Sequence, residues 1–222
     1  MTVMQHRATP PTWTLVVPLK PLPLAKSRLS GTTDDAARAG LALAFAQDTV
    51  SAALACAAVR DVAVVTDDQR AGAELGALGA RIVPDTPDNG LNAALTHGEA
   101  VVRARTPDAA LAALNADLPA LRPAELAQVL DAAARFPRAF LADAVGTGTT
   151  LLSALPGHAL APAFGLRSRE RHQASGAAEI ALSGVRSVRQ DVDTGADLAE
   201  AVALGVGAFT ARAHLGAGAA PA

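Results

Sequence analysis

Three aspartates, Asp117, Asp191 and Asp193, have the residue type and context of ligands for a hard divalent cation. Asp117 follows an apolar segment, so we expect it at the carboxyl end of a strand. Asp191 and Asp193 are two residues apart, and on an extended segment their side chains would share one face. Mg2+ binds one or two carboxylates together with water and substrate phosphates. Either segment alone is more typical of a loop acid or of a helix N-cap at Asp193, but together the segments make a Mg2+ site a competitive interpretation.

Basic residues gather in the segment that follows the first predicted strand. Lys20, Lys26 and Arg28 lie there, and the hydroxyl of Ser27 adds a hydrogen-bond donor. The formal net charge of the chain is -2, so this cluster of cations is a local feature. It could offset the charge of a triphosphate as pyrophosphate leaves. A phosphate site and a solvated loop are about equally consistent with the pattern, which matches neither a Walker A motif nor Gly-x-Gly-x-x-Gly.

Two glycine-containing segments could add polar groups to the same site. Gly90 permits a tight turn and Asn92 lies at a predicted helix start, a pattern that by itself indicates an ordinary turn and cap. Residues 148–150 and 164–168 combine small residues with hydroxyls, which can bind an anion, although a glycine-rich turn without a ligand is equally consistent. His172 lies one helical turn further on and could face that anion, but a lone histidine is more often a surface residue.

Strands and helices alternate along the first two thirds of the chain. Apolar segments bounded by turn residues predict strands, and longer Ala-rich segments predict helices. The expected strands are residues 13–18, 61–66, 81–84, 109–114 and 138–142, and the expected helices are residues 33–58, 69–78, 91–105 and 124–134. This alternation is typical of an α/β protein with a Rossmann-like, mostly parallel sheet and helices on both faces. Such sheets bind ligands at the carboxyl ends of their strands.

The regular alternation ends after Asp143. Beyond it we expect strands at residues 150–155 and 186–191 and a last helix at residues 194–204. The predicted organisation is a disordered leader over residues 1–12, a single domain over residues 13–210 and a flexible tail over residues 211–222.

Composition restricts the functional class. Hydrophobic residues make up 50% of the 222 residues, enough for a sizeable core, while aromatic residues make up only 3%. No apolar run approaches the roughly 20 residues of a membrane span, and the first residues lack the apolar core of a secretory signal. Cys56 is the single cysteine and cannot form an internal disulfide. These features favour a cytoplasmic protein that binds neither nucleic acid nor membranes.

Taken in order, the same segments resemble the phosphoenolpyruvate/2-phospho-L-lactate guanylyltransferase family of coenzyme F-420 biosynthesis. The resemblance covers about residues 15–204, and its specificity comes from the order of pieces that are weak singly. The matching pieces are Val17-Pro18-Leu19-Lys20, Ala25-Lys26-Ser27-Arg28-Leu29, Gly90-Leu91-Asn92-Ala93-Ala94-Leu95, Asp117-Leu118-Pro119, Gly146-Thr147-Gly148-Thr149-Thr150, Phe164-Gly165 with Ser168 and His172, and Asp191-Val192-Asp193-Thr194 with Asp197-Leu198.

The resemblance implies a nucleotide-diphospho-sugar-transferase type of fold and transfer of GMP from GTP to the phosphate of a three-carbon acid. It also implies which residues bind each ligand. These are Asp117, Asp191 and Asp193 for Mg2+, then Thr150, Gly165 and Ser168 for the phosphorylated acid, and Lys20, Lys26, Ser27, Arg28, Gly90 and Asn92 for the nucleotide and its phosphates.

The identity of the acceptor acid stays open at this point. Archaeal members of the family are associated with 2-phospho-L-lactate and many bacterial members with phosphoenolpyruvate. The Ala-rich, Lys-poor composition suggests a high-GC bacterial genome and so favours phosphoenolpyruvate, with 3-phosphoglycerate as a further candidate. Oligomeric state is not readable from the sequence. The reactive diphosphate product would be compatible with direct hand-over to the next enzyme, although no motif indicates it.

Two other functions compete with this interpretation. A molybdopterin or sugar nucleotidyltransferase usually has a Gly-rich first loop, whereas this chain has Pro-Leu-Lys-Pro-Leu-Pro-Leu there. A catalytically silent nucleotide-binding domain is the alternative from another class, and the presence of all three metal-type aspartates counts against it.

Overall fold

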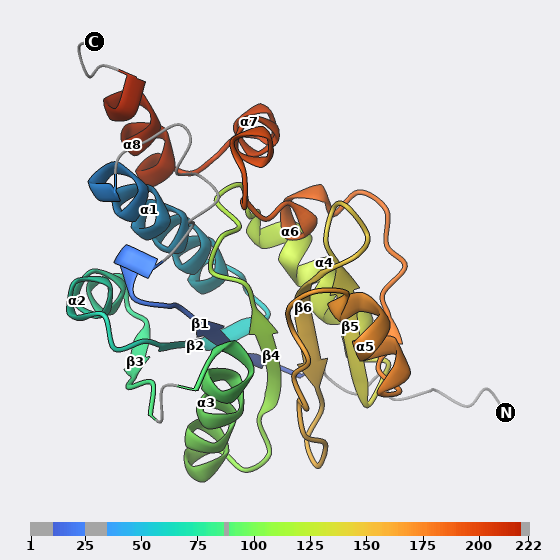
Figure 1. Ribbon diagram of the computed structural model, residues 1–222. Helices are drawn as coiled ribbons and strands as arrows, with labels where there is room; N and C mark the ends of the chain where they lie inside the picture. Colours follow the sequence, from blue (N-terminus) through green and yellow to red (C-terminus); the bar gives the residue numbers. More distant parts are fainter. Residues whose placement is uncertain (1–10, 25–34, 87–88, 219–222) are drawn as a thin grey trace, which may run out of the picture.

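The computed structural model describes residues 11–24, 35–86 and 89–218. Within these ranges the chain forms a seven-stranded sheet with helices around it (Figure 1). The strands are β1 (Trp13–Pro18), β2 (Val59–Val65), β3 (Arg81–Val83), β4 (Ala110–Leu114), β5 (Arg138–Ala142), β6 (Thr149–Ala154) and β7 (Ala178–Glu179). The helices are the short 3-10 helix η1 (Leu22–Leu24) and α1 (Asp35–Leu54), α2 (Gln69–Ala77), α3 (Leu91–Arg105), α4 (Pro123–Ala133), α5 (Ser168–Ala174), α6 (Arg186–Arg189), α7 (Gly195–Leu204) and α8 (Ala208–Gly218).

The strand order is β3-β2-β1-β4-β6-β5-β7. β1 lies inside the sheet and pairs in parallel with β2 and β4, and β7 pairs in parallel with β5. Of the strands described, only β6 runs antiparallel to its neighbours. The predicted mostly parallel α/β sheet is therefore confirmed. The reversed direction of β6 brings its amino end to the edge at which β1, β4 and β5 end.

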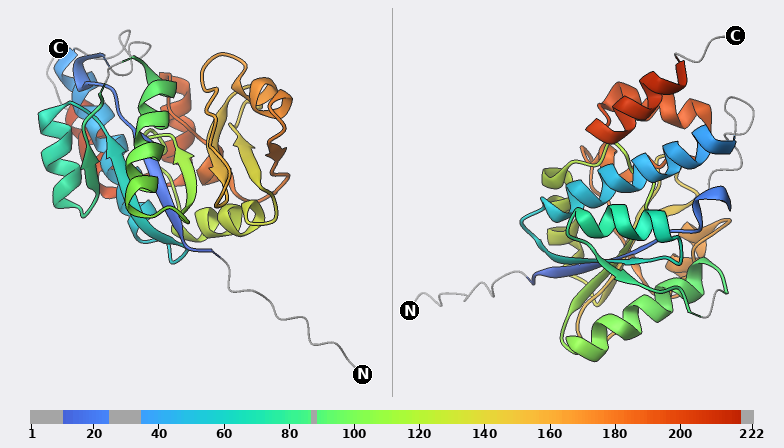
Figure 2. Two further views of the ribbon diagram at one scale, coloured as in Figure 1. Left: turned by 90° about the horizontal axis from the view of Figure 1, so that it is seen from below. Right: turned by 90° about the vertical axis from the view of Figure 1, so that its left-hand side faces the viewer.

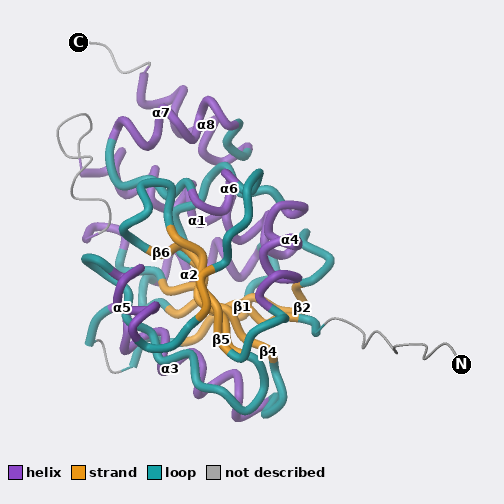
Figure 3. The backbone as a smooth tube through the Cα atoms, turned by 90° about the vertical axis from the view of Figure 1, so that its right-hand side faces the viewer, coloured by secondary structure: helices purple, strands orange, loops and turns teal. Residues whose placement is uncertain are grey.

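The core divides between the two faces of the sheet because successive strand residues point in opposite directions. Leu15 and Val17 of β1 pack with apolar residues of α1, α2 and α4, whereas Val16 packs with residues of α3. Figure 2 shows α3 on one side of the sheet and α1 and α2 on the other, and Figure 3 shows the strands enclosed by helices. Phe45 and Leu198 belong to a further cluster that joins the outer side of α1 to α7.

The predicted strand at residues 186–191 is wrong, because residues 186–189 form α6. Val185 and Val188 are both buried, and their separation of three residues is the spacing of a helical turn. The sheet edge on that side is β7, which is too short to be recognised as a sequence pattern. Arg189 instead reaches the sheet with its side chain, which donates to the carbonyl oxygen of Ala142 at 2.7 Å.

The structure also differs from the flexible tail expected from residue 211, because α8 continues to Gly218. Asp48 of α1 caps α8 by accepting the backbone N–H groups of Phe209 at 3.1 Å and Thr210 at 2.8 Å. A cap from so distant a residue leaves no local sequence signal. The other boundaries of leader, domain and tail stay predictions, since residues 1–10 and 219–222 lie outside the described residues. None of the described helices is long and apolar enough to cross a membrane.

Candidate active site

A cavity of about 600 Å³ lies where β1, β4 and β5 end and β6 begins. The register explains this convergence, since Ala142 at the end of β5 pairs with Thr149 at the start of β6. Segments that are distant in sequence thus reach one site. Among the residues that line it are Pro18, Leu19, Lys20, Leu91, Asn115, Asp117, Asp143, Thr147, Thr149, Gly165, Ser168, Asp191 and Asp193.

The three predicted metal-binding aspartates all line this cavity. Asp117 follows β4, and its carbonyl oxygen accepts the backbone N–H of Val192 at 3.1 Å. This hydrogen bond lays the segment that contains Asp191 and Asp193 directly beside Asp117. The structure therefore brings together two acidic segments that are more than seventy positions apart in sequence.

The helix cap that competed with the metal role of Asp193 is provided by other residues. Thr194 is the N-cap of α7, and its side chain accepts the backbone N–H of Asp197. The carboxylate of Asp197 accepts in return the backbone N–H groups of Thr194 at 2.8 Å and Asp193 at 3.2 Å. Asp193 thus precedes a capping box and does not supply the cap.

The fit of these acids to a metal ion depends on what completes the coordination. In the part of the chain that the structure describes, no group of three or more Asp, Glu, His or Cys side chains could hold a metal ion as it stands. The aspartates therefore do not form a closed protein cage. Their oxygen donors fit Mg2+ in the arrangement in which one or two carboxylates are supplemented by water and substrate phosphates.

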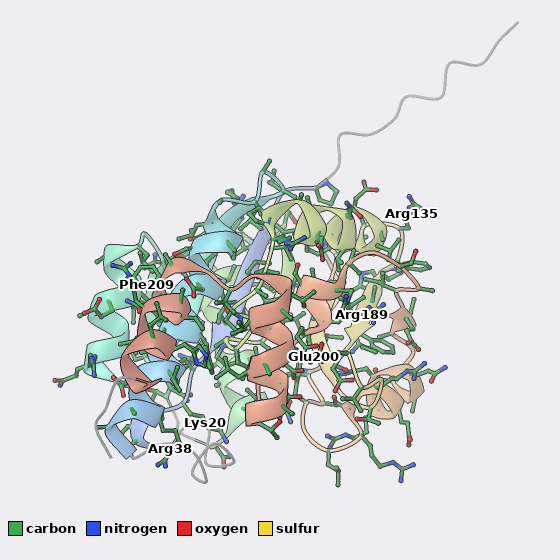
Figure 4. The ribbon with its side chains drawn as sticks, turned by 90° about the horizontal axis from the view of Figure 1, so that it is seen from above. Lys20, Arg38, Arg135, Arg189, Glu200 and Phe209 are labelled. Carbon is green, nitrogen blue, oxygen red and sulfur yellow. The ribbon has the colours of Figure 1, made fainter. Side chains whose placement is uncertain are left out.

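Of the predicted phosphate-binding residues, Lys20 lines the cavity and is exposed. Its segment is tied to the sheet by the backbone N–H of Leu19, which donates to the carbonyl oxygen of Val65 at 2.9 Å. Figure 4 shows Lys20 at the same end of the molecule as Arg38 of α1. The other three predicted residues, Lys26, Ser27 and Arg28, lie outside the described residues.

The predicted acceptor-binding residues lie on the β6 and α5 side of the cavity. Gly165 and Ser168 line it directly. Gly165 has φ +111°, a backbone conformation that favours glycine, and an added Cβ would come within 3.2 Å of a guanidinium nitrogen of Arg171. Thr150 is fully buried next to the wall, and its hydroxyl makes no hydrogen bond to any residue that the structure describes.

Asn92 and Gly90 are placed differently from the other predicted residues. Both side-chain amide atoms of Asn92 bind the backbone of Phe164, with Nδ2 donating to its carbonyl oxygen at 3.1 Å and Oδ1 accepting its N–H at 2.8 Å. Asn92 therefore holds the loop that presents Gly165. Gly90 is exposed at the start of α3 with φ +87° and does not line the cavity, whereas Leu91 does.

His172, which we considered as a residue facing the anion site, is fully buried behind the cavity wall. Its Nε2 lies 3.0 Å from the backbone nitrogen of Ala163, and its Nδ1 lies 2.9 Å from Oγ1 of Thr149. The ring packs edge-on against Phe164 with 5.0 Å between centroids. Burial, followed by the positive charges of Arg138 and Arg171, lowers the pKa of His172 to about 4.

The sequence interpretation gave no role to Asp143, and it included Thr149 only as part of the segment 148–150 that could bind an anion. Both residues line the cavity. The Asp143 carboxylate accepts the backbone N–H groups of Gly146, Thr147 and Gly148 at 2.6, 2.9 and 2.9 Å. It thereby folds the loop that leads into β6. An aspartate followed closely by a Gly-x-Gly sequence is typical of such a turn, so this signal was available in the sequence.

A model of the protein family described as "Guanylyl transferase CofC like" matches residues 13–215. Among its curated relatives, the chain is 71% identical over 199 residues to a protein of Streptomyces coelicolor named phosphoenolpyruvate guanylyltransferase. This alignment covers 90% of the present chain and 94% of the relative.

Solved structures support the fold. A 4-diphosphocytidyl-2C-methyl-D-erythritol synthase superposes with a TM-score of 0.59 at 13% identity, covering 87% of this chain and 99% of the other. The protein Rv0371C of Mycobacterium tuberculosis, solved in complex with manganese, superposes with a TM-score of 0.52 at 18% identity, covering 86% and 99%. A structure described as a nucleotide-diphospho-sugar transferase, from Desulfovibrio desulfuricans, superposes with a TM-score of 0.59 at 14% identity, covering 87% of this chain and 96% of the other. The chain thus has the predicted nucleotide-diphospho-sugar-transferase type of fold.

Proposed function

The chain belongs to the family of CofC-like guanylyl transferases, and from this premise we propose that it transfers GMP from GTP to phosphoenolpyruvate. The observation that carries the proposal is its 71% identity, over 90% of its length, to a relative named phosphoenolpyruvate guanylyltransferase. The products would be enolpyruvoyl-2-diphospho-5'-guanosine and pyrophosphate. We assign the reaction to coenzyme F-420 biosynthesis because the guanylyltransferase family that the sequence resembles acts in that pathway.

The proposed reaction depends more on positioning the two substrates than on proton transfer. A phosphate oxygen of the acceptor is already anionic, so it can attack the α-phosphorus of GTP without a general base. The new bond forms between that oxygen and the α-phosphorus, while the bond from the α-phosphorus to the β-phosphate breaks and pyrophosphate leaves with its electron pair. Because the two reactants repel each other, holding them in line should supply much of the rate enhancement.

The polar groups around the cavity suit two anions held side by side. Thr150, Gly165 and Ser168 would bind the phosphorylated acid on the β6 and α5 side. The buried Thr150 hydroxyl supports this role, since it lacks a hydrogen-bond partner among the described residues and such groups usually have one. Lys20 would bind GTP phosphates on the β1 side.

The remaining nucleotide residues are proposed from the family resemblance. Lys26, Ser27 and Arg28 would join Lys20 in stabilising the charge of the departing pyrophosphate. Gly90 and Asn92 would lie near the nucleoside, although the amide of Asn92 also binds the Phe164 backbone.

Asp117, Asp191 and Asp193 would hold Mg2+ at the cavity. When bound, the ion would neutralise phosphate charge and align the reactants. The shared cavity and the hydrogen bond from Val192 to the Asp117 carbonyl oxygen support this assignment. The manganese complex of a protein with the same fold is consistent with it.

The proposed function is tested by pairing nucleotides with acceptors. The protein is incubated with Mg2+, one of GTP, ATP or CTP, and one of phosphoenolpyruvate, 2-phospho-L-lactate or 3-phosphoglycerate, and the adduct and pyrophosphate are quantified by mass spectrometry. We expect GTP with phosphoenolpyruvate to give both products in equal amounts. An adduct only with 2-phospho-L-lactate would change the acceptor. The absence of any adduct, with no thermal stabilisation by any nucleotide, would reject the proposal in favour of a silent domain.

Replacing Asp117 with Ala tests the metal assignment in the same assay. We expect at least a roughly 100-fold loss of pyrophosphate release, since charge stabilisation by a metal ion is worth several kcal/mol. Asp131→Ala is the matched control, because Asp131 is exposed on α4 and pairs only loosely with Arg135 at 3.7 Å. Undiminished release by folded Asp117→Ala protein would remove Asp117 from the metal site.

A further inference from the structure

The hydrogen bonds of His172 determine which ring nitrogen carries its proton. The backbone N–H of Ala163 donates to Nε2 at 3.0 Å. An amide nitrogen can only donate, so Nε2 must act as the acceptor and carries no proton. The ring is fully buried, and Arg138 and Arg171 add positive charge near it, so the neutral form is favoured at neutral pH. A neutral imidazole has one N–H group, which therefore lies on Nδ1.

This tautomer makes Thr149 the acceptor of the next hydrogen bond. The Nδ1–H group of His172 points to Oγ1 of Thr149, 2.9 Å away. The hydroxyl hydrogen of Thr149 cannot lie on the same line and must point elsewhere. Within the described part of the chain, the structure gives this hydroxyl no other partner than His172. Thr149 is 4% exposed and lines the cavity, so we infer that its hydroxyl hydrogen is directed to a group bound there.

We propose that Thr149 donates a hydrogen bond to an anionic oxygen of the acceptor acid, and that His172 is a positioning residue that keeps the Thr149 hydroxyl oriented as a donor. This inference rests on the proposed function of the same cavity. Carboxylate and phosphate oxygens only accept hydrogen bonds, so a hydroxyl whose lone pair is already engaged suits them.

His172 makes a second hydrogen bond, which positions another part of the cavity lining. By accepting the Ala163 N–H it holds the residues just before Phe164 and Gly165. Asn92 binds the Phe164 backbone from the other side, at 2.8 and 3.1 Å. One buried imidazole therefore connects the Thr149 hydroxyl to the loop that presents Gly165. We expect both to be displaced together if the ring is replaced.

Thr149→Val tests the donor, since valine keeps the branched shape and removes only the hydroxyl. We expect the KM for phosphoenolpyruvate to rise roughly 10- to 100-fold, the usual range for a lost hydrogen bond to a charged group. The KM for GTP should stay within about twofold, and Thr149→Ser should restore the wild-type KM for the acid. Thr96→Val is the matched control, because the Thr96 hydroxyl is exposed and, among the described residues, bonds only the Asn92 carbonyl oxygen within α3.

The outcomes separate this inference from the proposed function. If the wild-type chain forms no adduct from GTP and phosphoenolpyruvate, the proposed function fails first. If the wild type is active and Thr149→Val has an unchanged KM for the acid, only the donor role of Thr149 is overturned.

The tautomer of His172 can be measured by NMR without an assay of enzyme activity. The full chain is labelled with 15N-histidine, and the ring signals of His172 are identified by their absence in His172→Gln. At pH 7 we expect a protonated Nδ1 and an unprotonated Nε2. A proton on Nε2, or a charged ring, would overturn the positioning role.

Discussion

The hydroxyl of Thr49, on α1, binds the backbone next to Asp117. Its oxygen accepts the N–H of Leu118 at 3.0 Å, while its single hydrogen faces the carbonyl oxygens of Phe45 at 2.8 Å and Ala116 at 3.2 Å. Thr49 is fully buried and does not line the cavity. It therefore acts on Asp117 through the peptide groups, which determine where the carboxylate lies.

We expect Thr49→Val to weaken both the fold and the proposed Mg2+ site. Valine has the same shape but leaves the Leu118 N–H without its acceptor, at a cost of about 1–3 kcal/mol in unfolding free energy. The Mg2+ concentration for half-maximal activity should rise, because Asp117 loses its anchor. Urea unfolding and a Mg2+ titration measure the two effects, and Thr49→Ser should reverse both. A normal Mg2+ response in a destabilised Thr49→Val protein would limit Thr49 to a structural role.

His172 should make stability depend on pH in one direction. Its folded-state pKa is about 4, below the value of about 6.5 in an unfolded chain. Between these values the unfolded state binds more protons, so the stability gained from the neutral ring is complete above pH 6.5 and is lost as the pH falls toward 4. The gap corresponds to at most about 3 kcal/mol.

Urea unfolding at pH 7 and pH 4.5 checks this dependence. The wild type should lose more stability between the two values than His172→Gln, which has no imidazole to protonate. If the unfolding free energy of His172→Gln depends on pH as strongly as that of the wild type, ionisable groups other than His172 cause the dependence. A 15N titration of wild-type His172 with a midpoint near 6.5 would contradict the account independently of the variant.

At the level of elements, the sequence predicted most of the strands and helices that form the site but not how they converge. β1 and β5 have their predicted bounds, because short apolar runs between turn residues are distinctive. The direction and place of β6 had no such signal, since a strand pattern does not show its partner. Only the pairing of β6 between β4 and β5 brings Thr149 to the cavity.

The structure departs from the expected elements where distant residues supply contacts. Asp48 of α1 caps α8, and Glu125 of α4 accepts both the N–H and the hydroxyl of Ser187 in α6 at 2.8 Å. The same limit applies to the site. The resemblance identified Gly165 and Ser168, which line the cavity, but the hydrogen bonds of Asn92 and His172 to the loop before them are visible only in the folded chain.

The loop between β5 and β6 should tolerate little change. A Cβ added at Gly148 would collide with the Asp143 carboxylate that binds the loop amides. We expect Gly148→Ala to cost about 1–3 kcal/mol in stability, as overpacking usually does, and to reduce activity by displacing Thr149. Gly40→Ala is the control, since a Cβ there meets no atom of the described residues within 4 Å and alanine suits the interior of α1. Equal stability and activity in both variants would contradict the role given to this loop.

On the scale of the whole molecule, one sheet edge gathers opposite kinds of groups into a single cavity. The aspartates that follow β4 and precede α7 line this cavity together with Lys20, which follows β1. Thr149 of β6 and Ser168 of α5 line its other side. With a net charge of -2, the protein has no general attraction for anions, so two anionic substrates must be held by local contacts. The central claim is that these contacts direct an acceptor phosphate oxygen to the α-phosphorus of GTP.

The measurement that tests this claim most directly uses phosphoenolpyruvate whose non-bridging phosphate oxygens are 18O. The reaction with unlabelled GTP and Mg2+ is followed by mass spectrometry of both products. We predict an adduct that retains all of the label and pyrophosphate that contains none, because the acceptor oxygen attacks and the bond to the β-phosphate breaks. Label in the pyrophosphate, release of pyruvate, or no adduct at all would contradict the account.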